Sequence, residues 1–262
     1  MKLLLKILGG IVGVIVLLLV AVVIFAFVTL RTNVPDDQFV LEPPASVGGF
    51  HVLVFGASGK LGVEISQVLT ARGDKVTAFV RETSDRSQLE AMGVAFTVGD
   101  ALDAESVLTS FQQGEYDAVI TTIGGFGEVM PDYTGNANIF DAAVAEGVNR
   151  VIMISTVGAG DSYDSAPLLS RLALAKVLPL KTQAEDHLRA SGLAYTIIRP
   201  GGLTPGEPTG SGLLSEDKTA MGWINRKDLA PLIVGALDDD RTIGKTFIAI
   251  DPTRSGAFDA FL

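Results

Sequence analysis

The feature that most constrains the fold is a regular alternation of short apolar runs with segments of helical periodicity, from about residue 50 to residue 250. The predicted strands cover residues 51–55, 75–80, 94–98, 118–122, 150–155, 194–198 and 245–250. The predicted helices cover residues 60–71, 88–92, 104–111, 132–146, 167–189 and 227–237. Strands that are apolar on both faces and alternate with helices form a parallel sheet covered by helices on both sides. We therefore expect one doubly wound α/β domain.

The turn after the first predicted strand carries three glycines spaced G-x-x-G-x-x-G, in the stretch FGASGKLG at residues 55–62. Gly56 would permit a tight turn, Gly59 would let the backbone approach a pyrophosphate, and Gly62 would let the helix pack close to the sheet. The free N–H groups at the start of that helix would attract the phosphates. The spacing alone is a weak signal, and a plain strand–helix turn is the alternative. The strand before it and the helix after it favour a Rossmann-like dinucleotide-binding turn.

The end of the second predicted strand bears on the choice of dinucleotide. Arg81 follows that strand directly, and Glu82 comes one residue later. A guanidinium at this position would pair with the 2′-phosphate of NADP, whereas an acid would accept hydrogen bonds from the ribose of NAD. We predict NADP in preference to NAD. Lys60, inside the glycine loop, could add a second phosphate contact.

The N-terminal part of the chain has a different character. Residues 7–30 contain no charge and are rich in Val, Leu and Ile. As a helix they would be about 36 Å long at 1.5 Å per residue, enough to cross a bilayer core of about 30 Å with some tilt. A cleaved signal peptide is the alternative, but its apolar region is usually shorter. We therefore predict a membrane anchor at residues 1–31, a Pro/Gly-rich tether at residues 32–49 and the folded domain at residues 50–262.

Two features of the sequence favour opposite sides of the membrane for the domain. Lys2 and Lys6 precede the apolar segment, whereas Asp36 and Asp37 soon follow it. The positive-inside rule then favours an external domain. A domain that uses a soluble dinucleotide should instead face the cytoplasm, and we expect that orientation.

Composition excludes several classes of function. The formal net charge is −10, and the first 31 residues hold basic side chains but no acid, so the folded part is more acidic still. Such a surface repels phosphate backbones, so we expect no nucleic-acid partner. The chain has no cysteine and only two histidines, His51 and His187, so we expect neither thiol chemistry nor a histidine-rich metal site.

The motifs together resemble the atypical short-chain dehydrogenases, NAD(P)-binding proteins of the NmrA-like and biliverdin-reductase-B-like kind. The matching stretches are VLVFGASGKLG, TAFVRETS, VAFTVGDALDAESV, GNANIFDAAVAEGVNRVIMISTVGA, LKTQAEDHLRASGLAYTIIRPGGL and INRKDLA, in the order of the family and over about residues 51–250. The resemblance implies cofactor contacts from Gly56, Ser58, Gly59, Lys60, Leu61, Gly62, Arg81, Asp100, Ala101, Thr122, Ile123, Gly124, Lys181, Pro200, Gly201 and Leu203. It also implies catalytic roles for Ser155, at the family's serine position, and for Lys181, beside the nicotinamide ribose.

One departure from the family pattern bears directly on activity. The dehydrogenase motif is Tyr-x-x-x-Lys, but the residue four positions before Lys181 is Val177. Tyrosine serves there as a general acid, and valine has no proton to give. Pro179 is also expected to interrupt the helix between the two positions. Tyr163 could substitute, although a surface tyrosine is the simpler interpretation, and His187 is expected to be a surface histidine.

Two functions remain open on the sequence. The first is a membrane-anchored NADP(H)-dependent oxidoreductase that transfers hydride to a small or lipophilic substrate, because relatives of this kind reduce conjugated ring systems without the tyrosine. The second is a non-catalytic NAD(P)-binding redox sensor, or an accessory or assembly subunit of a membrane complex. A homodimer is a further open partner. The glycine- and proline-rich residues 203–222 fit either a lid over a substrate or an ordinary surface loop.

Overall fold

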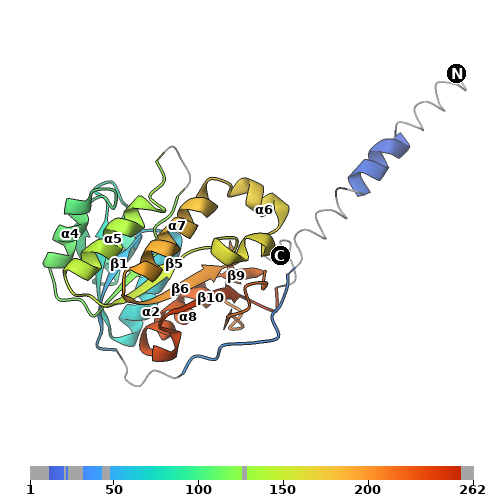
Figure 1. Ribbon diagram of the computed structural model, residues 1–262. Helices are drawn as coiled ribbons and strands as arrows, with labels where there is room; N and C mark the ends of the chain where they lie inside the picture. The colour runs from blue at the N-terminus through green and yellow to red at the C-terminus, as the bar shows by residue number, and fades with distance from the viewer. Residues whose placement is uncertain (1–11, 21, 23–31, 43–47, 126–128, 255–262) are drawn as a thin grey trace, which may run out of the picture.

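The structure is a computed structural model that describes residues 12–20, 22, 32–42, 48–125 and 129–254 (Figure 1). The strands are β1 (His51–Phe55), β2 (Lys75–Val80), β3 (Ala95–Val98), β4 (Ala118–Thr121), β5 (Arg150–Ile154), β6 (Ala194–Pro200), β7 (Gly202–Thr204), β8 (Leu213–Ser215), β9 (Trp223–Asn225) and β10 (Lys245–Ile250). The helices are α2 (Lys60–Arg72), α3 (Ser87–Ala91), α4 (Ala104–Gln112), α5 (Thr134–Ala145), α6 (Leu168–Ala173), α7 (Val177–Ala190) and α8 (Arg226–Asp238). Two short 3₁₀ helices complete them, η1 (Gly160–Ser165) and η2 (Asp240–Thr242).

The main sheet has eight strands in the order β3-β2-β1-β4-β5-β6-β10-β8. All neighbouring pairs are parallel except the last, in which β8 runs antiparallel to β10. A separate parallel pair joins β7 to β9. The doubly wound α/β domain predicted from the sequence is therefore confirmed, with the correction that one edge strand is antiparallel. Three-residue strands such as β8 are too short to leave a period-2 pattern in the sequence.

Helices cover both faces of the sheet, as Figure 1 shows. On one face, buried side chains of β1 such as Val52 and Val54 pack with Ile65 of α2 and Ile233 of α8. The opposite face of the same strand presents Leu53 and Phe55 to a second cluster formed with α4, α5 and α7. Adjacent residues of one strand are thus buried on opposite faces, which is why the strands read as continuous apolar runs.

The segment before the domain is packed against the edge of the sheet. Asn33 forms an antiparallel bridge with Met221, and Phe39 forms another with Leu214 of β8. The Phe39 ring also lies 4.8 Å from the ring of Phe247 in β10. Residues 33–42 therefore cover an edge strand that would otherwise present unpaired backbone groups to solvent.

The predicted anchor at residues 1–31 lies largely outside the described residues. Of that segment, residues 12–20 are helical and their side chains are exposed. No helix within the described ranges combines the length and the apolarity needed to cross a membrane.

Two local expectations about helices were wrong. The helix expected over residues 132–146 begins two residues later, because α5 has Tyr133 as its N-cap with no side-chain cap bond. The buried Asp132 carboxylate instead accepts a hydrogen bond from the Gly125 N–H at 3.1 Å. Pro179 does not interrupt a helix, because α7 begins at Val177 and places the proline in its first turn. The N–H groups of a first turn have no partner within the helix, so proline costs little there.

A buried ion pair fixes β6, α7 and η1 relative to one another. The Arg199 side chain in β6 is 1% exposed, and its guanidinium donates to the Glu185 carboxylate of α7 at 2.9 and 2.6 Å. It also donates to Asp161 of η1 at 2.6 Å. Because η1 follows the end of β5, this network holds the loop that leaves the carboxyl end of that strand.

We predict that Arg199→Met lowers the free energy of unfolding by about 3–5 kcal/mol, because the buried Glu185 carboxylate loses two hydrogen bonds and keeps only the partly exposed Arg189 as a counter-charge. The double variant Arg199→Met/Glu185→Leu should regain most of that loss. The control is Lys227→Met, which removes an exposed ion pair with Glu207 and should change stability by no more than about 1 kcal/mol. Urea unfolding of the three variants measures this, and equal losses for Arg199→Met and Lys227→Met would contradict the prediction.

Candidate functional site

A cleft of about 1020 Å³ opens at the carboxyl ends of the parallel strands. The loops that follow β1, β2, β3, β4, β5 and β6 all contribute to its lining, together with α7 and the start of α8. In open α/β sheets this edge is where ligands bind, because the loops diverge there at the change of strand order. The change of order in this sheet falls between β1 and β4.

The glycine loop forms one wall of the cleft through Gly56, Ser58, Gly59, Lys60 and Leu61. Gly56 has a φ of +78°, and a Cβ atom there would lie 2.4 Å from Oγ1 of Thr122. Only glycine fits both that conformation and that space. The N–H of Gly59 donates to the carbonyl of Gly56 at 3.0 Å, which closes the turn just before α2 begins.

Gly62 affects the cleft indirectly, because it is not among the described residues that line it. A Cβ atom on Gly62 would lie 2.2 Å from the carbonyl oxygen of Gly56. The third glycine therefore lets α2 approach the turn, and it shapes the cleft without facing it.

The N-terminus of α2 is open toward the cleft. Its N-cap, Gly59, makes no side-chain cap bond, and its first turn holds no acidic residue. The N–H groups of a first turn have no partner within a helix, and the macrodipole adds positive potential there. This end of the cleft thus fits a phosphate group without any change in side chains.

Besides Lys181, three cationic side chains line the same cleft: Lys60, Arg81 and Arg226. None of them donates a side-chain hydrogen bond to, or forms an ion pair with, a described residue. Arg226 stands at the start of α8, where burial lowers its pKa while the charge of Glu64 opposes that shift. Sequence reasoning overlooked Arg226, although it lies in the quoted stretch INRKDLA. Free cations gathered in one cleft of an acidic chain mark it as a site for an anionic ligand.

The loops after β3 and β4 form the next part of the wall. Asp100 and Ala101 follow β3, and the Asp100 carboxylate accepts the Leu102 N–H at 3.0 Å. Thr122 and Ile123 follow β4 and line the cleft beside them. These predicted residues are therefore brought together, while their contact with a cofactor stays a prediction.

Lys181 of α7 closes the opposite end of the cleft. Its ammonium donates to the carbonyl of Ile123 at 2.5 Å and to that of Ile154 at 3.2 Å, and it lies 3.4 Å from Oδ1 of Asp132. Burial lowers the pKa of Lys181, and the charge of Asp132 opposes that effect. Gly124 makes room for the pair, because a Cβ there would lie 2.8 Å from the Asp132 carboxylate. The pairing with Asp132 had no signal in the sequence.

Ser155 stands at the end of β5 and lines the cleft. The residue is 6% exposed, and its hydroxyl oxygen is buried with no hydrogen-bond partner among the described residues. An unpaired buried hydroxyl is costly unless a ligand or a water satisfies it. Ser155 is therefore placed to bond to a molecule bound in the cleft.

The missing tyrosine has no replacement among the described residues that line the cleft. Val177, at the family's tyrosine position, is buried at the start of α7 and does not reach the cleft. Tyr163 lies in η1, is half exposed and packs against the guanidinium of Arg171 at 5.2 Å. His187 bonds to Asp141 at 2.8 Å, outside the cleft.

The last part of the cleft is lined by Pro200 at the end of β6, by Gly201 and by Leu203 of β7. A Cβ atom on Gly201 would lie 2.1 Å from the carbonyl oxygen of Gly222, so two backbone segments approach closely here. Residues 203–222, predicted to be either a lid or a surface loop, contain the end of β7 and the whole of β8. Strand β8 belongs to the main sheet.

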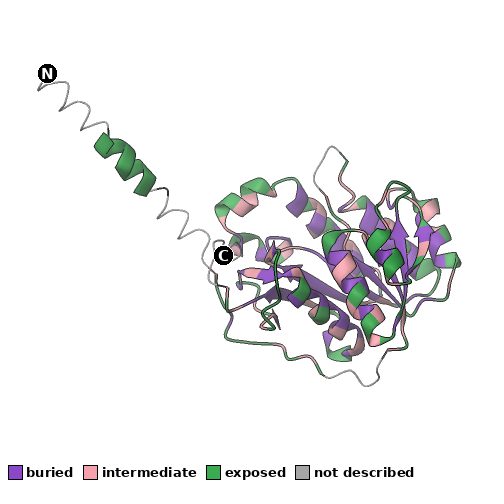
Figure 2. Ribbon diagram, turned by 180° about the vertical axis from the view of Figure 1, so that it is seen from behind, coloured by how far each residue is buried: buried purple, intermediate pink, exposed green. Residues whose placement is uncertain are grey.

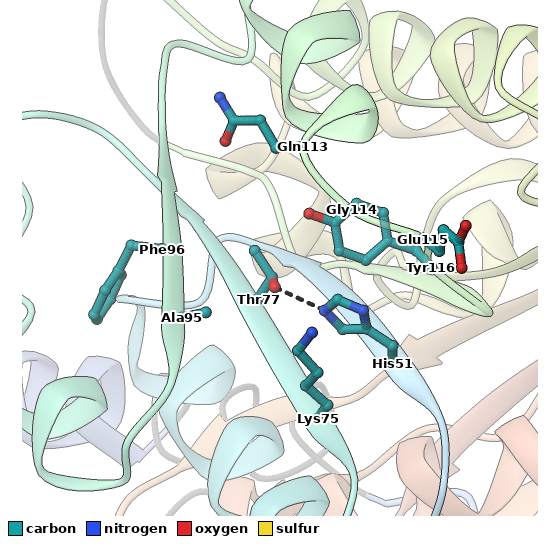
Figure 3. Close-up of a pocket in the computed structure, with 9 residues that line it drawn as sticks. All are labelled: His51, Lys75, Thr77, Ala95, Phe96, Gln113, Gly114, Glu115 and Tyr116. Atoms are coloured by element: carbon teal, nitrogen blue, oxygen red, sulfur yellow. Dashed lines mark hydrogen bonds between the residues drawn. The ribbon is translucent and has the colours of Figure 1, made fainter.

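A smaller cavity of about 380 Å³ lies at the amino ends of β1 and β2 (Figure 3). His51 bonds through Nε2 to the Thr77 hydroxyl at 2.9 Å, and its ring lies 4.6 Å from that of Tyr116. Burial lowers the pKa of His51, and the nearby Lys75 adds to the effect. A neutral, bonded histidine packed on an aromatic ring has the features of a structural residue, and this cavity lies apart from the strand ends that form the cleft.

Comparison with known proteins gives a consistent family. A family model described as NAD(P)H-binding matches residues 56–240. The uncharacterized sugar epimerase YhfK of Bacillus subtilis is 31% identical over 204 residues, which are 75% of this chain and 92% of that protein. Sanguinarine reductase of Eschscholzia californica is 28% identical and aligns with 75% of this chain and 87% of its own. The solved structure of ChuY, an anaerobillin reductase of Escherichia coli O157:H7, superposes with a TM-score of 0.72 at 30% identity, over 79% of this chain and all of that one. These matches confirm the resemblance expected from the sequence.

We predict that Gly62→Ala destabilises the domain by about 1–3 kcal/mol, because its Cβ would overlap backbone atoms that cannot move independently of the turn. The matched control is Gly125→Ala, whose Cβ would meet only Pro131, at 3.8 Å. Thermal and urea unfolding of both variants measure the difference. Equal stability of the two variants would show that α2 does not depend on close approach to the glycine turn.

Proposed function

This chain belongs to the NAD(P)H-binding family, and we propose that it is an NADP(H)-dependent oxidoreductase. The observation that carries the proposal is the meeting of an open helix N-terminus with three cations that have no hydrogen-bond or ion-pair partner among the described residues, in one cleft at the carboxyl edge of the sheet. Two of the similar proteins are named as reductases, which supports this class of reaction.

The cofactor fits the groups that line the cleft. The first turn of α2 with Gly59 and Lys60 would hold the pyrophosphate, and Arg81 would pair with the 2′-phosphate of NADP. Asp100 and Ala101 would border the adenine. Bound in this way, the nicotinamide supplies the hydride, and the protein supplies binding and orientation.

The residues at the other end of the cleft would orient the reacting groups. The Lys181 ammonium, already held by two carbonyls and Asp132, would meet the nicotinamide ribose. The Ser155 hydroxyl would donate its proton to a hydrogen bond with an oxygen of the substrate and so fix its position. With valine at position 177, no phenol stands beside Lys181 to transfer a proton, so the chemistry suits substrates that accept hydride with proton delivery from solvent.

We further propose that residues 1–31 anchor the protein in a membrane with the domain in the cytoplasm, and that the substrate is lipophilic. The supporting observation is the uncharged run at residues 7–30, which is long enough to span a bilayer core. Digestion of intact cells with an external protease tests the orientation, and loss of the domain under that treatment would contradict it.

A non-catalytic redox sensor, or a subunit of a membrane complex, is the second candidate. The observation that favours it is Val177 in place of the general acid. The two functions share the cofactor site and differ in turnover.

The cofactor assignment predicts a selective loss of affinity. Arg81→Ala should weaken NADPH binding about 10- to 100-fold, because it removes charge-assisted hydrogen bonds to the 2′-phosphate, while NADH binding changes little. The matched control is Lys75→Ala, at the other end of β2, which should leave both affinities unchanged. Titration by calorimetry measures this. Equal losses for NADPH and NADH, or no loss, would contradict the role of Arg81.

The catalytic assignment predicts a separation of binding from turnover. Ser155→Ala should keep the wild-type affinity for NADPH within about twofold and lower kcat by about tenfold or more, because one hydrogen bond to the substrate is lost. Oxidation of NADPH in the presence of quinones, flavins and carbonyl compounds measures the rate. Tight NADPH binding with no turnover of any of these would favour the sensor instead.

A further inference from the structure

The short helix α6 is unusual because none of its residues is buried, although half of them are leucines. Leu168, Leu169 and Leu172 are 48%, 44% and 65% exposed, and Tyr163 of η1 is 49% exposed beside them. Figure 2 shows this helix mainly in the colour of exposed residues, standing off the body of the domain. Contiguous exposed apolar side chains of this kind mark an interaction surface. We call these four residues the leucine face.

A chain of contacts links the leucine face to the place where the N-terminal segment joins the domain. The guanidinium of Arg171 in α6 reaches Asp164 of η1 at 3.5 Å. Asp161, also in η1, lies 3.7 Å from the ammonium of Lys218. The next residue, Thr219, accepts the side-chain amide of Asn33 through its carbonyl at 2.8 Å.

Figure 1 places α6 at the same end of the domain as β9, and Asn33 forms its bridge with Met221, two residues before β9 begins. The uncharged run ends at residue 30, only three residues before Asn33. Three residues reach at most about 10 Å even when fully extended. An anchored chain therefore has the surface around Asn33 within about 10 Å of the point where it leaves the bilayer.

We propose that the leucine face lies in the surface of that same bilayer and docks the domain on it. The inference rests on the membrane anchor of the proposed function and adds an orientation to it. A short helix that exposes leucines beside Arg171, with Lys176 just after its end, has the composition of a segment that lies in the interface between headgroups and acyl chains. Its charges are nearly balanced by Asp161 and Asp164, so the attachment is apolar and does not require anionic lipid.

This orientation has a consequence for substrate entry. Thr156 lines the cleft and precedes η1 by four residues, so the leucine face is continuous with the loop beside Ser155. A domain docked through α6 presents this side of the cleft to the acyl chains. A lipophilic substrate then reaches the reacting end from the bilayer without crossing water.

The absence of cysteine makes a direct test practical, because a single introduced thiol is the only one in the chain. The full chain is placed in phosphatidylcholine nanodiscs as Leu172→Cys, labelled with an environment-sensitive fluorophore. The matched control is Val144→Cys, at a residue that is 51% exposed. Its helix, α5, lies on the opposite side of the domain from α6 in Figure 1. Quenching is compared between brominated acyl chains and aqueous iodide. NADPH titration and flotation with the discs are measured on the same samples.

The label at position 172 should lose about half or more of its emission to brominated lipid and resist iodide, since interfacial helices bury their apolar face about 5–10 Å deep. The label at position 144 should show the reverse. Quenching of both labels by iodide alone overturns the docked orientation while flotation and NADPH binding still uphold the proposed function. A shielded label that brominated lipid does not quench identifies a second copy of the chain on the leucine face and also overturns the proposal. Failure to float overturns the docking together with the anchor.

Discussion

The arrangement of the cleft depends on one buried cation, the ammonium of Lys181. It is shared between the carbonyl ends of β4 and β5 and the carboxylate of Asp132, so it ties α7 to the two strands at the centre of the sheet. A buried charge is tolerated only when its partners are in place, and removal of one partner leaves the other uncompensated. The position of this end of the cleft is therefore set by the same contacts that stabilise the charged lysine in the interior.

The two ends of the cleft handle charge in opposite ways. At the Lys181 end, the cation bonds to two carbonyls and forms an ion pair with Asp132. At the other end, Lys60, Arg81 and Arg226 line the cleft next to an uncapped helix N-terminus, and none of them has a side-chain hydrogen bond or ion pair within the described part of the chain. This arrangement stands out in a chain of net charge −10, in which carboxylates outnumber cationic side chains. Lys60, Arg81 and Arg226 together give a local positive field inside an acidic protein, which favours capture of a phosphorylated ligand.

Much of the fold could be predicted because it depends on local patterns. The bounds of β1, β2 and β10 match the apolar runs, and the glycine turn lies where the spacing places it. The contact between Asp132 and Lys181 could not be predicted, because it joins residues 49 positions apart and depends on the packing of α7. The antiparallel strand β8 and the docking of residues 33–42 depend on edges that exist only once the sheet has formed. Arg226 lies in the stretch INRKDLA that resembles the family, but only its position near α2 in the fold identifies it as a cleft residue.

The single tryptophan offers the most direct test that the cleft holds a dinucleotide. Trp223 is the only tryptophan in the chain, and its ring in β9 packs against Gly202. The neighbours of Gly202 in the chain, Gly201 and Leu203, line the cleft. Its emission overlaps the absorption of the reduced nicotinamide, so bound NADPH should quench it by energy transfer. The account predicts saturable quenching of Trp223 by NADPH with one site per chain, reversed by excess NADP. Quenching that does not saturate, or that excess NADP leaves unchanged, would contradict the central claim.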